Sequence, residues 1–242
     1  MSGVEGKAFS KPTPGLIAVT PMTRLRAVIF DMDGVLADTE PIYMEINRDL
    51  LSELGIALPF EHLLPYVGIP AKRMWSELRS RFEIQQPLSE LIRLEKDRQV
   101  QQLKGMKQIP EIPGVRPLLE ELSQMGIPMA VASSSSREIV ELILSKVAVR
   151  HFFRATVSGQ DVPQGKPAPD IFLKAAETLG VEPRNCVVIE DSPPGVKGAK
   201  NAGMACVGFA NTHSGRLDLS GADLILSDFS PESRLKIKKL IL

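Results

Sequence analysis

Short apolar runs that end in polar residues occur near the start of the chain and repeatedly in its second half. The first run, Ala27 to Phe30, leads directly into Asp31, and Asp33 and Gly34 follow. An unbroken apolar run of this length is typical of a strand buried on both faces of a parallel sheet. Similar runs predict strands at 127–132, 155–158, 186–189, 204–209 and 222–226.

Helical patterns fill the intervals between these later strands. They predict helices at 115–124, 137–146, 169–179, 195–201 and 235–242. Strands that alternate with helices predict an α/β fold with a mostly parallel sheet covered on both faces. The last helix is basic and amphipathic, which we interpret as one face packed on the core and one face in solvent.

The stretch between the first strand and this alternation is helical throughout. Apolar residues recur there at four-residue spacing, at Ile42, Ile46, Leu50 and Leu54. Further helices are predicted at 70–82 and 88–104, and nothing in the stretch has the pattern of a strand.

This change of pattern predicts the domain organisation. We expect an all-helical cap domain at 41–109, inserted into a core formed by 24–40 and 110–242. Residues 1–23 are rich in Pro, Gly and Ser, and we expect them to form a flexible tail.

Charge and cysteine content narrow the class of partner and the compartment. Lys and Arg number 29, as do Asp and Glu, so no basic excess favours nucleic acid or an anionic membrane surface. No apolar run approaches the ~18 residues that span a bilayer. Cys186 and Cys206 lie in apolar runs, which favours two buried thiols in a reducing cytoplasm. A monomer is the default expectation.

Polar residues of a consistent kind stand at the ends of the predicted strands or in the connections between them. They are Asp31 and Asp33, Ser133 and Ser134, Lys166, and the pair Glu190 and Asp191. Each feature alone has an ordinary interpretation: a turn, a helix cap, a solvated lysine and an acidic turn. Together they are unlikely to be coincidence, because parallel strands bring their carboxyl ends to one edge of the sheet, where ligands bind.

The residue types at this edge point to phosphate and magnesium chemistry. Adjacent carboxylates such as Glu190 and Asp191 repel each other unless a cation lies between them. An oxygen-rich cluster without His or Cys suits Mg²⁺. Hydroxyls at a helix N-terminus, such as Ser133, and a fixed cation, such as Lys166, suit a phosphate.

In combination these motifs resemble those of the haloacid dehalogenase superfamily of phosphotransferases. Four segments carry the resemblance: FDMDGVLADTE, AVASS, GKPAPDIF and VVIEDSPPGV. It covers nearly all of the chain from Leu25 onward and is closest to the branch of beta-phosphoglucomutase and small sugar-phosphate phosphatases. It implies a Rossmann-like, three-layer α/β/α core with an inserted helical cap.

The resemblance also implies roles for individual residues. Asp31 would be the nucleophile that forms an aspartyl-phosphate, and Asp33 would be the general acid and base. Phosphate would be held by Ser133, Ser134, Lys166 and Gly34. Mg²⁺ would be bound by Asp31, Asp33 through its backbone carbonyl, Glu190 and Asp191, with Glu190 acting directly or through water.

We therefore expect a Mg²⁺-dependent phosphatase of a small phosphorylated metabolite, and among such metabolites we expect a sugar phosphate. A phosphosugar mutase is the alternative within the same fold, and a non-catalytic binding module is the alternative from another class. The cap residues that could contact substrate are Tyr43, Lys72, Arg73 and Lys96. Tyr43 stands where mutases of the branch have a histidine, and this departure favours the phosphatase.

Overall fold

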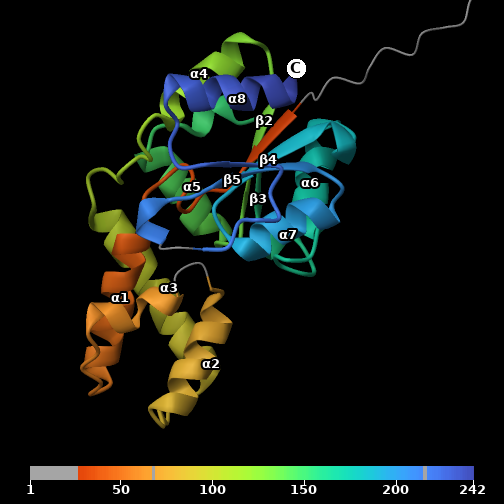
Figure 1. Ribbon diagram of the computed structural model, residues 1–242. Helices are drawn as coiled ribbons and strands as arrows, with labels where there is room; N and C mark the ends of the chain where they lie inside the picture. The colour runs from red at the N-terminus through yellow and green to blue at the C-terminus, as the bar shows by residue number, and fades with distance from the viewer. Residues whose placement is uncertain (1–26, 67–68, 215–216) are drawn as a thin grey trace, which may run out of the picture.

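A computed structural model describes residues 27–66, 69–214 and 217–242. The predicted tail at 1–23 lies outside the described residues. Six parallel strands form one sheet in the order β3-β2-β1-β4-β5-β6 (Figure 1). The strands are β1 (Ala27–Phe30), β2 (Met129–Ser133), β3 (Ala155–Ser158), β4 (Cys186–Glu190), β5 (Ala205–Phe209) and β6 (Leu224–Leu226).

Helices cover both faces of this sheet, as the alternating pattern predicts. They are α4 (Val115–Gln124), α5 (Arg137–Lys146), α6 (Asp170–Leu179), α7 (Pro193–Asn201) and α8 (Pro231–Ile241). Alternate residues of each strand point to opposite faces, so Val28 and Phe30 pack with α4, α5 and α8, whereas Ala27 and Ile29 pack with α6 and α7. The result is the expected three-layer α/β/α core.

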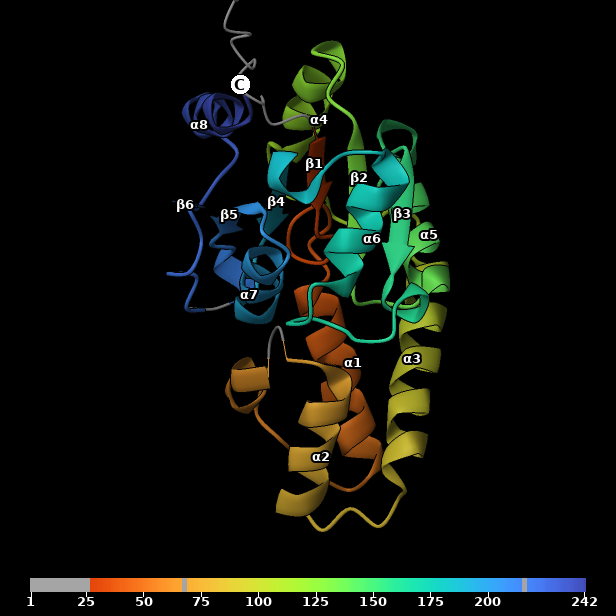
Figure 2. The same ribbon diagram turned by 90° about the vertical axis from the view of Figure 1, so that its right-hand side faces the viewer.

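The remaining three α-helices of the described residues are α1 (Glu40–Glu53), α2 (Ala71–Arg81) and α3 (Leu88–Gly105). They lie beyond the carboxyl edge of the sheet, and we refer to them with their connections as the helical insertion (Figure 2). The insertion has an apolar cluster of its own, which includes Leu51, Trp75 and Leu78. Its division from the core as a domain at 41–109 stays a prediction.

Several element boundaries differ from the sequence prediction by a few residues, for local reasons. Helix α8 begins at Pro231 rather than at 235, because Ser230 caps it and proline suits the first turn. Helix α7 begins at Pro193 for the same reason, with Ser192 as its cap. The basic helix α8 packs on the core through Ile237 and Ile241, as the sequence predicts.

The strand order places β1 between β2 and β4, in the middle of the sheet. The chain crosses the sheet in one direction from β1 to β3 and in the other from β4 to β6. Ligands of open α/β sheets bind where the strand order reverses in this way. The residues that follow β1 therefore lie at the position that the fold favours for a binding site.

Candidate active site

A cleft of about 390 Å³ lies between the carboxyl edge of the sheet and the helical insertion. The core contributes residues from the ends of β1 and β4 and from the connections after β2 and β3, namely Asp31, Asp33, Ser134, Ser135, Ser136, Lys166, Glu190, Asp191, Ser192 and Pro194. The insertion contributes residues of all three of its helices, among them Tyr43 of α1, Met74 of α2 and Glu95 of α3. Residues that the sequence places far apart thus meet in one cleft.

Lys166 joins two of the predicted carboxylates. Its Nζ lies 2.5 Å from Asp31 Oδ1 and 2.7 Å from Glu190 Oε1, and the three side chains are almost wholly buried. Asp31 is fixed further because its backbone N–H donates to Ile189 O at 2.9 Å, which extends the β1–β4 pairing by one residue. A buried amine held by two carboxylates is a rigid, charged centre.

Glu190 is held on both of its oxygens. Oε1 accepts from Lys166, and Oε2 accepts from the backbone N–H of Ser192 at 2.7 Å and from its hydroxyl at 2.9 Å. The side chain lies against Gly195, where a Cβ would meet Oε1 at 1.7 Å. These contacts favour a positioning role for Glu190 over direct ligation of a metal.

Asp33 is surrounded by hydroxyl groups. Thr39 Oγ1 and Tyr43 OH donate to its Oδ1 at 2.7 and 3.0 Å. Ser135 Oγ donates to Oδ2 at 2.9 Å, and Ser133 Oγ lies 3.4 Å from the same oxygen. Neutral donors from the core and from the insertion thus orient this carboxylate toward the cleft without an opposing charge.

Gly34 makes room for Asp191. Its φ of +76° suits glycine, and a Cβ there would meet Asp191 Oδ2 at 2.0 Å. Its backbone N–H donates to Ala37 O at 2.8 Å, and its carbonyl accepts from Asn211 Nδ2 at 3.0 Å. This arrangement gives Gly34 a steric role and does not favour the predicted phosphate contact.

The serine run forms the turn from β2 into α5. Ser133 is fully buried and its Oγ accepts from the backbone N–H of Ser135 at 3.1 Å, so it shapes the turn. Ser134, Ser135 and Ser136 line the cleft instead. Ser136 is the residue before α5, and its buried Oγ has no hydrogen-bond partner among the described residues. That hydroxyl and the helix N-terminus leave donors that suit an anion.

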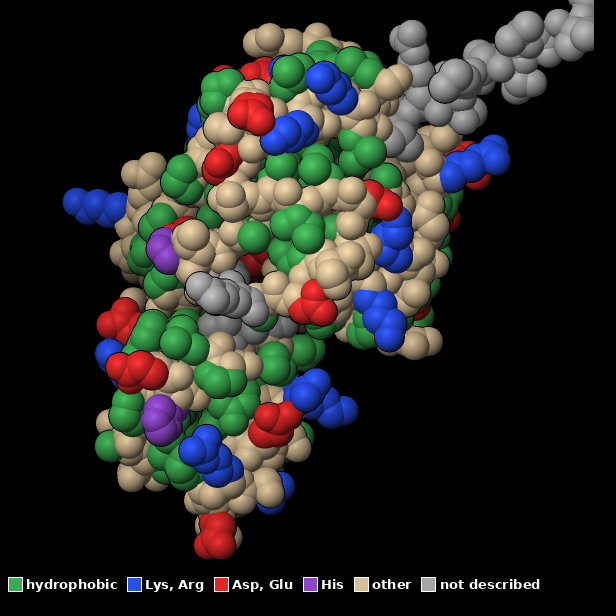
Figure 3. Space-filling model, in the orientation of Figure 1, with side chains coloured by type: hydrophobic (Ala, Val, Ile, Leu, Met, Phe, Trp, Pro, Cys, Tyr) green, Lys and Arg blue, Asp and Glu red, His purple; other side chains and the backbone are tan. Residues whose placement is uncertain are grey.

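Carboxyl groups outnumber lysines in the described lining of the cleft. The carboxylates are Asp31, Asp33, Glu40, Glu95, Glu190 and Asp191, whereas the described lining cations are Lys96 and Lys166. Outside the cleft, Lys and Arg side chains are interspersed with Asp and Glu on the face seen in Figure 3. An anionic substrate would therefore meet local repulsion unless a further cation entered the cleft.

Burial shifts the pKa of several of these groups. It raises the pKa of Asp31 to about 7, against the opposing charge of Lys166, and the pKa of Glu40 to about 8. Burial alone would lower the pKa of Lys166, but the charges of Asp31 and Glu190 outweigh it and raise the pKa. Burial also raises the pKa of Tyr43 well above its ordinary value, so its phenol stays neutral and can donate to Asp33.

The four insertion residues predicted to contact substrate separate into two groups. Tyr43 and Lys96 line the cleft. Lys72 and Arg73 are exposed and are not part of its lining, and Arg73 pairs with Glu77 at 2.9 Å on the surface of α2. Trp75, from the same helix, is fully buried in the apolar cluster of the insertion.

The carboxylates of the cleft suit a magnesium ion that takes few of its ligands from protein side chains. In the part of the chain that the structure describes, no three His, Cys, Asp or Glu side chains form a metal-binding group. Magnesium, however, uses one or two carboxylates and fills its remaining positions with water and substrate oxygens. Asp31 and Asp191 supply two carboxylates to one cleft, and the close approach of Asp191 to Gly34 places it beside the segment of Asp33.

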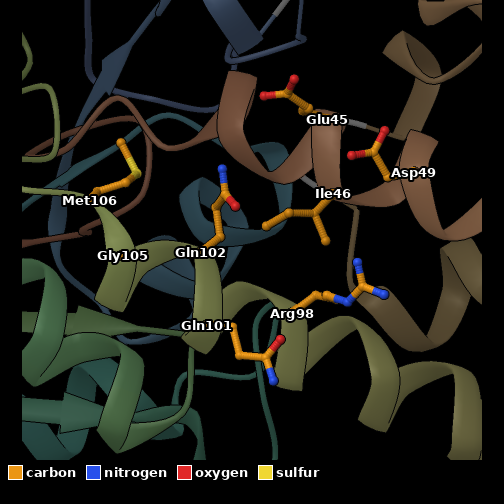
Figure 4. A pocket seen from close by; sticks show the side chains of 8 residues that line it. All are labelled: Glu45, Ile46, Asp49, Arg98, Gln101, Gln102, Gly105 and Met106. Atoms are coloured by element: carbon orange, nitrogen blue, oxygen red, sulfur yellow. The ribbon is translucent and has the colours of Figure 1, made fainter.

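A second hollow, of about 640 Å³, lies between α1 and α3 and shares no lining residue with the cleft. In Figure 4, Arg98 and Gln102 extend from α3 toward α1, which carries Glu45 and Asp49, whereas Gln101 points away from these acids. Arg98 is already paired with Glu53, and the side chains of Glu45 and Asp49 are exposed to solvent. The cleft with Asp31 and Lys166 is therefore the candidate active site.

Sequence reasoning missed several residues of this site. Ser135 and Thr39 orient Asp33, Ser192 and Gly195 shape the surroundings of Glu190, and Asn211 fixes the turn at Gly34. Ser135 stands inside the serine run, and Ser192 and Gly195 stand directly after the acidic pair, so their positions carried a signal. Asn211 carried none, because it lies 177 residues from its partner.

Residues 28–209 match the model of one protein family, described as haloacid dehalogenase-like hydrolase. The chain belongs to this family. A phosphorylated carbohydrates phosphatase of Thermotoga maritima is 35% identical to this hydrolase, and the alignment covers 90% of this chain and 100% of the relative. Fructose-1-phosphate phosphatase YqaB of Escherichia coli is 33% identical and covers 76% of this chain and 96% of the relative. These relatives confirm the expected class, a phosphoric monoester hydrolase.

Solved structures agree with this assignment. A putative beta-phosphoglucomutase from Thermotoga maritima has a TM-score of 0.69 at 31% identity and covers 90% of this hydrolase and 100% of that chain. CbbY from Rhodobacter sphaeroides in complex with phosphate has a TM-score of 0.69 at 29% identity, and the match covers 86% of this hydrolase and 96% of CbbY. The Rossmann-like core expected from the sequence is confirmed. Phosphatases of the family generally use Mg²⁺.

Proposed function

We propose that this hydrolase removes phosphate from a small sugar phosphate, with Mg²⁺ and through a phosphorylated Asp31. The observation that carries the proposal is the buried bridge of Lys166 between Asp31 and Glu190, with Asp33 held beside it by hydroxyls. A carboxylate that is fixed next to a cation can attack phosphorus, and the cation offsets the charge that develops.

The phosphoryl group would lie between Lys166 and the start of α5. Lys166 Nζ supplies positive charge on one side. Ser134, Ser135 and Ser136 line the other side, where the Ser136 hydroxyl lacks a partner among the described residues. Helix N-termini bind phosphate through their free N–H groups, which supports this placement.

Asp33 would move the protons of the reaction. Its carboxylate faces the cleft two residues from Asp31, and it is partly exposed rather than buried. In the first step it would protonate the leaving oxygen, and in the second it would take a proton from the attacking water. The hydroxyls of Thr39, Tyr43 and Ser135 hold it in place for both tasks.

Mg²⁺ would be held by the carboxylates of Asp31 and Asp191 and by the backbone carbonyl of Asp33. When bound, it supplies positive charge to the phosphoryl oxygens. The excess of carboxylates over lysines in the cleft supports this proposal, because the site needs a further cation to accept an anion. Glu190 would act on the metal at most through water, since both of its oxygens are already bonded.

The substrate class follows from the relatives, two of which are named as phosphatases of phosphorylated carbohydrates and of fructose 1-phosphate. A mutase must also hold a second phosphate, which calls for cations on the helical insertion. Among the described lining residues the insertion offers one cation, Lys96. This favours the phosphatase over the mutase. A monomeric protein in the cytoplasm, with residues 41–109 as a cap, completes the proposal.

None of the described helices is long and apolar enough to cross a membrane. Cys186 and Cys206 are buried free thiols, as expected, which supports a reducing compartment.

The experiment is a measurement of phosphate release from a panel of sugar phosphates, nucleotides and phosphoglycolate, with Mg²⁺ and with a chelator. Asp31→Asn is compared with Asp49→Asn, which removes an exposed acid outside the cleft. We expect Mg²⁺-dependent release that Asp31→Asn abolishes and Asp49→Asn leaves in place. Unchanged release by Asp31→Asn would refute the nucleophile. A lack of release together with isomerisation that needs a bisphosphate primer would establish the mutase.

A further inference from the structure

Helix α3 presents one face to the cleft, and three of the four side chains on it are polar. Ile92, Glu95, Lys96 and Gln99 all line the cleft, at spacings of three and four residues that place them on one side of a helix. Figure 2 shows α3 beside α1 below the carboxyl edge of the sheet. The leaving group of a substrate whose phosphate lies at Lys166 would face this wall.

Glu95 is the unusual member of the face. It is 5% exposed, and it lies beside the apolar cluster that contains Trp75 and Leu91. Trp75 Nε1 donates to its Oε2 at 2.8 Å, and Gln99 Nε2 donates to its Oε1 at 3.3 Å. Burial raises the pKa of Glu95 to about 7, although hydrogen bonds from Trp75 and Asn47 oppose the shift.

The packing of the insertion does not require a charge at this position. A neutral glutamine has the same shape and would accept the same hydrogen bond from Trp75. A buried carboxylate, in contrast, costs stability whenever it is ionised. A contact with a ligand would explain why the wall of the cleft carries a carboxylate that destabilises the fold when it is ionised.

Asn47 of α1 adds a second polar group to the same wall. It is 8% exposed, it lines the cleft as Glu95 does, and it lies close enough to oppose the upward shift of the Glu95 pKa. Its Nδ2 lies 3.6 Å from Met74 Sδ, a weak acceptor, and its Oδ1 has no partner among the described residues. A buried amide oxygen without a partner is expected to find one when a ligand binds.

We propose that Glu95 and Asn47 bind hydroxyl groups of a polyhydroxylated leaving group and so make this hydrolase selective for phosphorylated polyols and sugars. The inference rests on the proposed function and names the residues that would set its substrate class. Carboxylate and amide oxygens accept from hydroxyls, and a diol can donate to both. A leaving group without hydroxyls leaves Asn47 Oδ1 without a partner and adds no donor to the Glu95 carboxylate, which disfavours it.

The same wall disfavours a leaving group that carries its own phosphate. Glu95 would repel such a group, and Lys96 is the single described cation that the insertion brings to the cleft. The charge of the wall thus selects against bisphosphates, while its acceptors select for hydroxyls.

The test compares two esters, fructose 1-phosphate, whose leaving group is polyhydroxylated, and phenyl phosphate, whose leaving group has no hydroxyl. The selectivity is the ratio of kcat/KM for the first ester to that for the second. Glu95→Gln keeps the shape and removes the charge, and Asn47→Leu keeps the volume and removes the amide. Asp97→Asn is the matched control, because it removes an exposed charge from the same helix outside the cleft.

We expect Glu95→Gln and Asn47→Leu each to lower the selectivity by roughly tenfold or more, mainly through a higher KM for fructose 1-phosphate. Asp97→Asn should keep the selectivity of the unaltered protein. Trp75→Phe, which removes the donor that orients Glu95, should lower the selectivity by a smaller factor without being a direct contact. Sorbitol 6-phosphate should respond to these substitutions as fructose 1-phosphate does.

Two results would overturn the inference. The first is an equal loss on both esters in Glu95→Gln and Asn47→Leu, which would assign a merely structural role. The second is a selectivity that neither substitution changes. Release from phenyl phosphate in the unaltered protein keeps the proposed phosphatase in place under either result. Failure of the unaltered protein on both esters would remove the proposed function and this inference together.

Discussion

The phenol of Tyr43 donates a hydrogen bond to Asp33 Oδ1 at 3.0 Å and thereby joins the helical insertion to the candidate proton-transfer group of the core. Thr39 donates to the same oxygen at 2.7 Å from the segment that leads into α1. The orientation of Asp33 thus depends on where α1 begins relative to β1. A shift of the insertion relative to the core would therefore change the orientation of the Asp33 carboxylate.

Tyr43→Phe should lower kcat/KM for phosphate release by roughly tenfold or more, because a hydrogen bond to a carboxylate contributes about 1.5–3 kcal/mol. Thr39→Val should have an effect of similar size. The double variant should lose more than the product of the two factors, since each hydroxyl compensates for the loss of the other. Steady-state kinetics of the four proteins measures this coupling, and independent effects would contradict a shared role at Asp33.

Sequence patterns predict the parts of this molecule that depend on local order. The run Ala27 to Phe30 predicts β1, and Asp31, Lys166 and Glu190 stand at the ends of predicted strands or in the connections after them. All three do meet in one cleft, because the sheet is parallel and its carboxyl ends share an edge.

Contacts that depend on packing across the insertion could not be predicted in this way. The carboxylate of Glu95 faces the cleft because α2 and α3 pack together and bring Trp75 against it, 20 residues away in sequence. Arg73 looks equally suited to an anion, yet α2 turns it to the surface. Helical periodicity gives the face of a helix but not the neighbour that the face meets.

Gly195→Ala should disturb the bridge between Lys166 and Glu190. Alanine favours a helix over glycine by up to about 1 kcal/mol, but its Cβ would stand 1.7 Å from Glu190 Oε1. The carboxylate cannot easily move away, because Lys166 holds Oε1 and Ser192 holds Oε2. The clash should dominate, with a free energy of unfolding lowered by about 1–3 kcal/mol and phosphate release reduced by roughly tenfold or more.

Gly105→Ala is the control for this substitution. It lies at the end of α3, and a Cβ there would meet nothing within 4 Å. Thermal or urea unfolding of both variants, together with their activity, separates the steric effect from a general effect of alanine. Equal stability and activity of the two variants would show that the surroundings of Glu190 yield to a methyl group.

Substitution of the insertion cations should show that Lys96 contributes to substrate binding and that Lys72 and Arg73 do not. Lys96→Ala should raise KM for a sugar phosphate by roughly threefold to tenfold, because it removes a cation from the lining of the cleft. Lys72→Ala and Arg73→Ala should each change KM by less than about twofold, since exposed charges outside the cleft are screened. A larger effect of Arg73→Ala than of Lys96→Ala would contradict the placement of these side chains.

Glu95→Gln should make the protein more stable at alkaline pH. Because burial raises the pKa of Glu95 from 4.5 to about 7, the folded chain binds more protons than the unfolded chain between these values. The free energy of unfolding should therefore fall as pH rises from 4.5 to about 7, by up to about 3 kcal/mol from this group. Above about pH 7 the free energy of unfolding should stay at this lower value, because Glu95 is then ionised in both the folded and the unfolded chain.

Glutamine at this position removes the titration while keeping an acceptor for Trp75. Urea unfolding at pH 5.5 and pH 8.5 should show a stability gain of Glu95→Gln over the unaltered protein that is larger at pH 8.5. Asp97→Asn, on the exposed side of α3, should show no such difference between the two pH values. A Glu95→Gln variant that is less stable at pH 8.5 would mean that the ionised carboxylate stabilises the fold. A gain in stability with a loss of selectivity for sugar phosphates would mean that the charge serves binding.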